Sequence, residues 1–196
     1  MEQAFLLRAY GACWGPEAGP WNLSVQNKYL EYMFARFFEE HFPLPEYVRI
    51  CNIGIGAGYW DRYLSYQLRG GSLTSIDADE VCCRQLREGL ENEGNPNSVE
   101  ILCSDVMGLD LAERFDIVTM VGSTRLESGL YENILEKAFS FVKPGGGFYY
   151  QSLDKEEPKE RFATLCGKNG MTVDQYLFDG TYGFRAQYWK AGRPGV

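Results

Sequence analysis

The chain has 196 residues, a length that suits one domain built around a single hydrophobic core. Its composition, 45% hydrophobic and 23% charged, excludes a largely disordered or fibrous chain. With 19 Lys and Arg against 27 Asp and Glu, the net charge of −8 disfavours nucleic acid or an anionic membrane as a partner. The single histidine, His41, excludes a His-ligated metal centre and any catalytic device that needs two imidazoles.

The first 45 residues differ from the rest of the chain. Residues 1–22 are rich in aromatic residues, Gly and Pro. Ser24 is a candidate N-cap for a helix that runs to about His41. The predicted apolar stripe of this helix consists of Val25, Tyr29, Met33, Phe37 and Phe38. We therefore expect residues 1–45 to form a helical and aromatic lid on the remainder of the protein.

From residue 46 onward, short apolar runs alternate with amphipathic stretches. The pattern predicts strands over 47–53, 73–76, 99–103, 115–121 and 148–153, and helices over 59–68, 81–90, 130–142 and 157–169. KPGGG is predicted to be the turn before the strand FYYQSL. Such alternation is typical of an α/β fold with a doubly wound, mostly parallel sheet and helices on both faces.

The C-terminal quarter has a different pattern. The runs TVDQYLF and FRAQYWKA, joined by DGTYG, predict an antiparallel hairpin that completes a seven-stranded sheet. The chain contains no internal repeat and no linker long enough to separate domains. We therefore predict a single domain, residues 1–196, with a cap over 1–45 and an α/β core over 46–196.

The six cysteines, at positions 13, 51, 82, 83, 103 and 166, show no C-x-x-C spacing. Cys51, Cys82 and Cys103 lie among apolar residues, which predicts small core side chains in a reduced, cytoplasmic protein. The adjacent Cys82 and Cys83 leave a redox or metal role open, but neighbours on a helix point in different directions, which favours a structural role. The chain begins without a leader pattern, and no stretch approaches the roughly 20 apolar residues of a membrane span.

A glycine-rich segment, ICNIGIGAG, closes the first predicted strand and opens the next helix, with glycines at 54, 56 and 58. Glycine lets the backbone turn sharply and lets a ligand approach the peptide groups, and the free N–H groups at a helix start bind polar or anionic groups. A dinucleotide-binding loop has the spacing G-x-G-x-x-G, but residue 59 is Tyr, so the spacing here is G-x-G-x-G. The loop predicts a ligand site; the alternative is a tight turn that needs glycine for packing only.

Acidic residues follow the next two predicted strands. Asp77 ends the second strand about 20 residues after the loop, where an acid can accept hydrogen bonds from both hydroxyls of a ribose. Asp105 follows the third strand and is suited to accept a hydrogen bond from the exocyclic amine of adenine, with Val106 against the ring. Each acid alone is also a candidate helix N-cap. The coincidence of the loop and both acids at three consecutive strand ends favours a nucleoside-binding site.

These residues resemble the class I S-adenosylmethionine (SAM)-dependent methyltransferases, whose fold is a seven-stranded, Rossmann-like α/β sheet. Gly54, Gly56 and Gly58 match the first motif of the family, and Asp77 and Asp105 match the acids that follow its second and third strands. Residues 115–118 and 135–147 are similar to the fourth strand and to the helix, turn and fifth strand that follow it.

The resemblance covers about residues 46–191 and implies SAM as the cofactor. It also implies that Ala78, next to Asp77, and Gly122, after the fourth strand, contact the cofactor. One position departs from the family pattern: the usual acid two residues before the first glycine is Asn52. Asn52 is therefore expected to bind as an uncharged hydrogen-bond acceptor.

The sequence also excludes some members of this family. Methyltransferases that act on amines of nucleic-acid bases resemble one another in an Asn/Asp-Pro-Pro-aromatic motif after the fourth strand, whereas residues 121–125 read VGSTR. The missing motif and the net charge of −8 make a base methylase a poor candidate. No cluster of acids and His resembles the metal site of catechol-type enzymes, so no metal is expected.

The aromatic residues of the N-terminal segment are candidates for binding the methyl acceptor. Tyr10, Trp14, Trp21 and Tyr29 either close a lid over the methyl donor or pack the N-terminal helix onto the sheet, and the sequence favours neither.

Two further residues are weak catalytic candidates. Arg125 follows the fourth strand, where it either clamps a carboxylate acceptor or, as the sequence favours, pairs with Glu127. His41 is a candidate general base, but its place at the end of a helix favours a simple interaction with the helix dipole.

The sequence thus predicts a SAM-dependent methyltransferase that acts on an O or N atom of a small molecule or of a peptide terminus. The poverty of histidine favours a carboxylate or another acceptor that needs no base. One alternative is a non-catalytic, cofactor-binding regulatory or partner subunit, which Asn52 favours. The other is a nicotinamide-dependent oxidoreductase, which Tyr59 disfavours.

Overall fold

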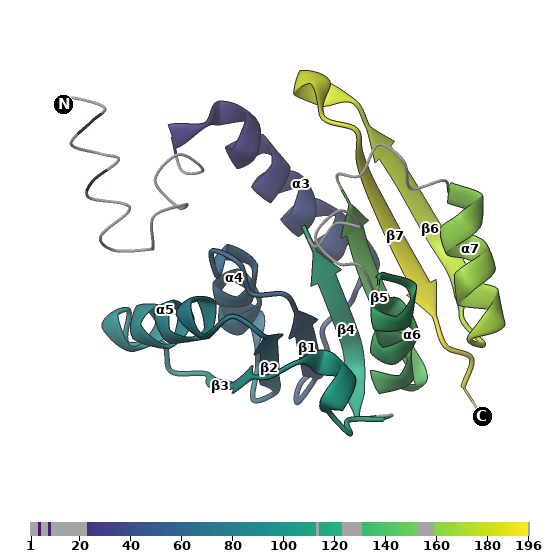
Figure 1. The fold of residues 1–196 in the computed structure, drawn as a ribbon, viewed down its shortest axis with the longest axis horizontal. Helices are drawn as coiled ribbons and strands as arrows, with labels where there is room; N and C mark the ends of the chain where they lie inside the picture. Colours follow the sequence, from purple (N-terminus) through teal and green to yellow (C-terminus); the bar gives the residue numbers. More distant parts are fainter. Residues whose placement is uncertain are drawn as a thin grey trace.

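A computed structural model describes Ala4, Arg8 and residues 23–112, 114–122, 131–152 and 159–195. Its helices and strands alternate from residue 49 onward, as the hydrophobic pattern predicts (Figure 1). In chain order they are α3 (Val25–His41), β1 (Arg49–Ile53), α4 (Tyr59–Gln67), β2 (Ser72–Asp77), α5 (Glu80–Asn92), β3 (Ser98–Cys103), η1 (Val106–Gly108), β4 (Phe115–Val121), α6 (Tyr131–Phe141), β5 (Val142–Ser152), α7 (Lys159–Lys168), β6 (Thr172–Asp179), η2 (Thr181–Gly183) and β7 (Ala186–Gly192).

The strands form one seven-stranded sheet in the order β3-β2-β1-β4-β5-β7-β6. Strands β1 to β5 are parallel, and β7 lies antiparallel between β5 and β6. The predicted doubly wound sheet with a C-terminal antiparallel hairpin is confirmed. Because parallel strands end at the same edge, this order brings the ends of β1, β2, β3 and β4 together.

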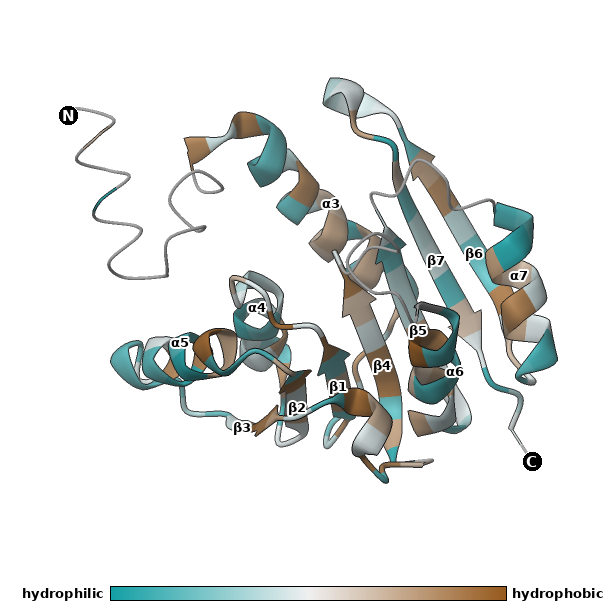
Figure 2. Cartoon of the chain, in the orientation of Figure 1, coloured by the Kyte–Doolittle hydropathy of each residue, from teal (hydrophilic) through white to brown (hydrophobic). Residues whose placement is uncertain are grey.

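Helices cover both faces of the sheet (Figure 1). On one face, apolar residues of α3 and α4, among them Leu30, Phe34 and Trp60, pack against β1, β4 and β5. On the other face, residues of α6 and α7, including Leu135 and Phe162, pack against the same strands. Figure 2 shows that β4 is apolar along most of its length, whereas α5 and α7 carry hydrophilic surfaces. None of the described helices has the length and apolar character needed to cross a membrane.

The N-terminal helix has the predicted bounds and, apart from its first turn, the predicted buried face. Ser24 caps it, since its hydroxyl accepts a hydrogen bond from the backbone N–H of Asn27 at 3.2 Å. Val25, predicted to lie in the apolar stripe, is 71% exposed. Met33, Phe37 and Phe38 of the predicted stripe are buried, and Leu30 and Phe34 also belong to the buried face. The stripe prediction failed in the first turn because that turn extends beyond the sheet that the helix covers (Figure 1).

Two further predictions need correction. The segment KPGGG belongs to β5, where a register shift lets Val142 and Gly147 pair with Phe115 and Ile117. Gly145, at φ +78°, provides the backbone conformation that this irregularity requires.

Cys103, predicted to be a core residue, is exposed because it ends the edge strand β3.

We expect Phe38 to be essential for holding α3 on the sheet. Its side chain is 1% exposed and its ring lies 5.1 Å from that of Phe42, 5.3 Å from that of Trp60 and 5.8 Å from that of Tyr149. Phe38→Ala should lower the free energy of unfolding by about 3–5 kcal/mol, measured by urea denaturation. Tyr32→Ala on the same helix, at a side chain that is 56% exposed, is the control and should change it by less than about 1 kcal/mol. Equal losses in both variants would contradict the predicted packing.

Candidate functional site

The glycine-rich loop has a backbone that requires glycine at each of its three positions. Gly54, Gly56 and Gly58 have φ angles of +87°, +53° and +75°. The N–H of Gly54 donates to the carbonyl of Ile76 at 2.8 Å, which ties the loop to the end of β2. A Cβ on Gly56 would meet nothing within 4 Å, so the chain bends there in the open. At Gly56 the loop therefore has no side chain and no neighbouring atom that would keep a ligand from its backbone.

Asp77 lies against this loop, as the sequence predicts. Its Oδ2 accepts hydrogen bonds from the backbone N–H of Ile55 at 2.7 Å and of Gly56 at 3.3 Å. Its Oδ1 accepts from the N–H of Asp79 at 2.9 Å. The carboxylate thus joins the loop to the end of β2. An ionised carboxylate has about four acceptor positions, which leaves room for a hydroxyl of a ligand.

The end of β3 lies beside Asp77. The N–H of Ser104 donates to the carbonyl of Asp77 at 2.8 Å. Asp105 is exposed and caps η1, with its Oδ1 accepting from the N–H of Met107 at 2.9 Å. Val106 is only 7% exposed and belongs mainly to the core. The acid that was predicted to bind adenine therefore also has the alternative role of an N-cap.

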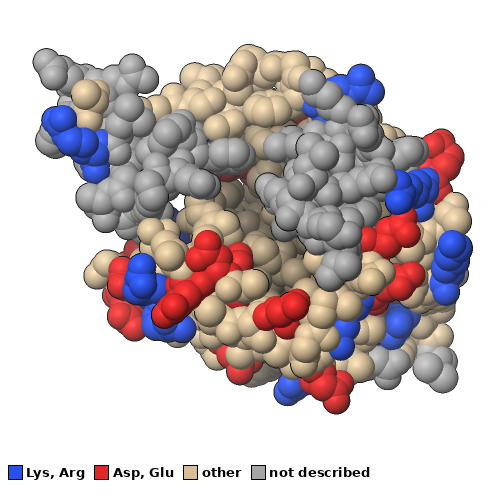
Figure 3. Space-filling model, viewed as in Figure 1, with Lys and Arg blue, Asp and Glu red and all other residues tan. Residues whose placement is uncertain are grey.

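The remaining predicted cofactor contacts lie on both sides of the loop. Ala78 is exposed next to Asp77. Gly122 follows β4 at φ +74°, and its N–H donates to Gln151 Oε1 at 2.9 Å. The face drawn in Figure 3 is hollowed below α3, and acidic side chains are spread over its lower half.

Asn52 is not at the surface of the site. It is 0% exposed, and its Nδ2 donates to the carbonyl of Gly54 at 3.0 Å and to Asp61 Oδ1 at 2.9 Å. Its Oδ1 accepts from the hydroxyl of Thr119 at 2.8 Å, and that hydroxyl oxygen accepts from Trp60 Nε1 at 3.1 Å. The prediction that the Asn52 carbonyl faces a ligand is therefore wrong, because that oxygen is bonded to β4. Asn52 instead holds the first glycine of the loop from below.

Asp61 supplies a carboxyl group beside Asn52. It lies in the first turn of α4 and is 0% exposed. Burial raises the pKa of Asp61 to about 6, although the hydrogen bond from Asn52 opposes the shift. Where the family usually has an acid, this chain therefore has the amide Asn52, and the acid Asp61 is hydrogen-bonded to it. The sequence pattern did not reveal this pair, because the two residues are separated by the whole loop.

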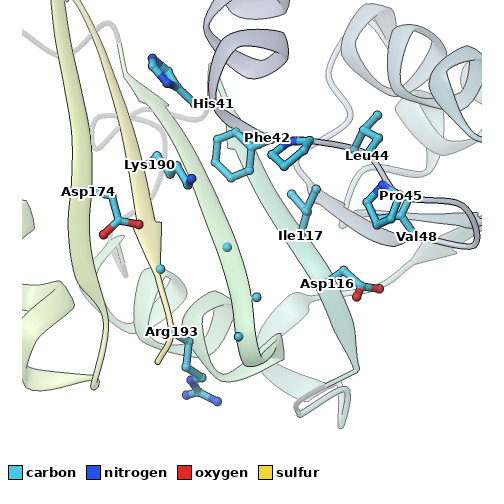
Figure 4. A pocket seen from close by; sticks show the side chains of 15 residues that line it. His41, Phe42, Leu44, Pro45, Val48, Asp116, Ile117, Asp174, Lys190 and Arg193 are labelled. Carbon is cyan, nitrogen blue, oxygen red and sulfur yellow. The ribbon is translucent and has the colours of Figure 1, made fainter. Parts of the chain in front are cut away.

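His41 is the last residue of α3, and its side chain is drawn in Figure 4. Its ring contacts that of Phe37 at 4.5 Å, and it lines a cavity of about 650 Å³ together with Asp116 and Gly146, near the amino-terminal ends of β4 and β5. The glycine-rich loop lies at the carboxyl-terminal end of β1. The structure therefore contradicts His41 as a general base at that loop.

The aromatic lid falls mostly outside the described residues, as do Tyr10, Trp14, Trp21 and Arg125. Tyr29 is described. Its hydroxyl donates to Thr181 Oγ1 at 3.4 Å, and its ring lies 5.4 Å from that of Tyr182 in an edge-on arrangement. Tyr29 therefore packs α3 against the turn between β6 and β7.

Comparison with known proteins agrees with this geometry. Residues 50–146, about half of the chain, match a family model described as a methyltransferase domain. The ubiquinone biosynthesis O-methyltransferase of Stutzerimonas stutzeri (strain A1501) is 24% identical over 149 residues, which are 76% of this chain. The match spans 61% of that relative's length.

Two solved structures share the fold. Magnesium protoporphyrin IX methyltransferase (ChlM) from Synechocystis PCC 6803, solved with bound SAM, has a TM-score of 0.73 at 14% identity, covering 98% of both chains. The 4+2 cyclase SpnF has a TM-score of 0.74 at 13% identity, covering 89% of this chain and 84% of its own.

The sheet order, the glycine-rich loop and the acid that holds it define a Rossmann-like domain of the methyltransferase type. With the family match over residues 50–146, the chain contains a methyltransferase domain with the fold of the class I SAM-dependent methyltransferases.

We expect Asp61 to make the stability of the protein depend on pH. Its pKa in the folded chain, about 6, is above the ordinary value of 3.8, so the folded state binds this proton more tightly than the unfolded state. The resulting stabilisation is complete below about pH 4 and is lost as the pH rises through about 6, a change on the order of 3 kcal/mol. Asp61→Asn, which keeps an oxygen for the bond from Asn52, should remove this dependence.

Urea denaturation between pH 4 and 8 measures the effect, with the exposed Asp110→Asn as the control. The control should keep the wild-type pH profile. An identical profile in Asp61→Asn and wild type would show that Asp61 does not titrate in this range.

Proposed function

We propose that the protein binds SAM at the glycine-rich loop and transfers its methyl group to an O or N atom of a small molecule or of a peptide terminus. The observation that carries the proposal is the joint position of the loop and Asp77. Three glycines with positive φ let the backbone turn with no side chain over the loop, and a carboxylate of the neighbouring strand lies against it. This is the arrangement that a nucleoside with two ribose hydroxyls requires.

The residues of the chain fit the parts of SAM in order along the sheet edge. Asp77 would accept hydrogen bonds from the ribose, Ala78 would lie beside it, and Asp105 would accept from the adenine amine. Gly54 would present its carbonyl, fixed by Asn52, to the ammonium group of the methionine part. When bound, SAM supplies a methyl group activated by a sulfonium. The residues need only bind, orient and exclude water, which is the main requirement of an in-line displacement.

The buried Asn52–Asp61 pair supports a functional site over a degenerate one. Asn52 alone removes a negative charge, and for that reason it favours a non-catalytic, cofactor-binding subunit. Asp61 Oδ1 lies 2.9 Å from Asn52 Nδ2, so this chain still has an acid close to the loop. Since the same fold also occurs in a protein named as a cyclase, transfer of the methyl group needs a direct test.

Calorimetry with SAM and with its demethylated product tests the proposal. Wild type should bind both, and Asp77→Asn should weaken binding about 10-fold to 100-fold, because hydrogen bonds to a charged group contribute about 1.5–3 kcal/mol. Asp79→Asn is the matched control: it makes the same charge change two residues away, and Asn still caps α5. Its affinity should equal that of wild type.

The other outcomes are equally definite. No binding of SAM to wild type would refute the proposal, and tight binding of NADH instead would support an oxidoreductase. Incubation with SAM and a cell extract, followed by mass spectrometry, should show a compound that gains one methyl group. Binding of SAM without any such gain would favour the non-catalytic subunit.

A further inference from the structure

Two polar side chains beside Gly122 are fully buried, yet each has one polar group without a partner. Gln151 and Tyr188 are both 0% exposed. In the part of the chain that the structure describes, Gln151 Nε2 and the Tyr188 hydroxyl form no hydrogen bond. Such a buried, unsatisfied group destabilises the folded state, and proteins contain few of them. Two such unsatisfied groups on paired residues point to a ligand that binds both.

The two side chains, hereafter the polar pair, lie next to each other at the carboxyl edge of the sheet. Gln151 of β5 is directly opposite Tyr188 of β7, and Val121 of β4 lies in the same row. Residues opposite each other on neighbouring strands point to the same face. That face is the one that α3 covers, because the Tyr188 ring lies 6.3 Å from that of Phe34 and 5.6 Å from that of Phe37.

The same row of the sheet leads to the glycine-rich loop. Asn52 pairs with Thr119, which puts Val121 level with Gly54. Neighbouring strands are about 4.8 Å apart, so the polar pair lies roughly 10–15 Å from β1 along the sheet. It lies beyond β4, on the side away from β2 and its ribose-binding acid. A second substrate has to approach the donor from this side, because β2 and β3 provide the nucleoside contacts.

The polar pair offers hydrogen-bond donors. Gln151 Oε1 accepts from the N–H of Gly122 at 2.9 Å, so the group left over is the amide NH₂, which only donates. Burial raises the pKa of Tyr188 well above its usual value, and Asp179 and Tyr29 raise it further, so the hydroxyl stays protonated at neutral pH. Of these two neighbours, the Asp179 carboxylate is negatively charged and would repel an anion. The surroundings favour an uncharged oxygen over a carboxylate.

We infer that Gln151 and Tyr188 together donate hydrogen bonds to an uncharged oxygen, a hydroxyl or a carbonyl, of the molecule that receives the methyl group. The inference rests on the proposed function for the identity of that molecule as the acceptor. It sharpens the acceptor class, since a carboxylate, which the scarcity of histidine favours, does not suit this pair. Gln151 and Tyr188 are binding residues here, and the oxygen that they hold need not be the atom that is methylated.

Ligand-observed NMR on the protein saturated with S-adenosylhomocysteine tests the inference with four probes on one ring scaffold. Phenol and benzaldehyde carry an uncharged oxygen, benzoate a carboxylate, and toluene no oxygen. Phenol and benzaldehyde should bind more tightly than toluene and benzoate. Tyr188→Phe should weaken binding of phenol about 3-fold to 10-fold, the value of one net hydrogen bond. Gln151→Glu, tested at a pH at which its carboxyl group is ionised, keeps the acceptor for Gly122 and removes the donor, so it should have a similar effect.

The melting temperature separates a ligand-binding role from a structural one. Tyr188→Phe removes a hydroxyl without a partner, so the melting temperature should stay the same or rise. Tyr149→Phe is the matched control: its buried hydroxyl donates to the carbonyl of Phe34 at 3.2 Å, so its loss should lower the melting temperature and leave phenol binding unchanged.

Three results would overturn the inference: equal binding of phenol and toluene, tighter binding of benzoate, or unchanged phenol binding in Tyr188→Phe. Failure of the proposed function is separate, because it appears as absent binding of S-adenosylhomocysteine to wild type. In that case the same probes, added to the protein alone, still test the polar pair.

Discussion

A single buried amide, that of Asn52, connects the parts of the molecule on which the site depends. Through its hydrogen bonds it joins the end of β1 to the first glycine of the loop, to Asp61 of α4 and to Thr119 of β4. The glycines leave the loop backbone free to turn, and the Asn52 amide and the Asp77 carboxylate select one conformation from below and from the side. Because both anchors come from strand ends, the position of the loop follows the register of the sheet.

This arrangement changes the electrostatics expected of the family. The charge that usually stands on the strand is carried by a buried helix residue, and the amide lies between it and the loop. Burial makes that carboxyl group easier to protonate than an exposed acid. The site thus combines a rigid polar support with an acid whose charge depends on pH near 6. A cation bound at the Gly54 carbonyl would favour the ionised form of this acid.

The antiparallel strand β7, next to β5, provides the second part of the proposed site. A sheet with only parallel strands would leave β5 paired with a strand that runs the same way, whereas β7 enters antiparallel and begins at the edge where β5 ends. For that reason Tyr188 and Gln151 are paired on neighbouring strands, and their side chains lie side by side on the same face of the sheet. The residues proposed to bind the nucleoside follow β1, β2 and β3, and the polar pair comes from β5 and β7. The strand β4 separates two sets of contacts of different chemistry.

The sequence by itself determined the alternation of strands and helices, the cap at Ser24, the glycine-rich loop and Asp77, because each depends on local periodicity, turn chemistry or the place where a strand ends. It did not determine the exposure of Val25 in α3, the burial of Asn52, the position of His41 away from the loop or the pairing of Gln151 with Tyr188. These depend on contacts between residues far apart in the chain, such as the 67 positions between Asn52 and Thr119. Only the register of the folded sheet decides which residues, far apart in the chain, lie side by side on neighbouring strands. The proposed site consists of such neighbours.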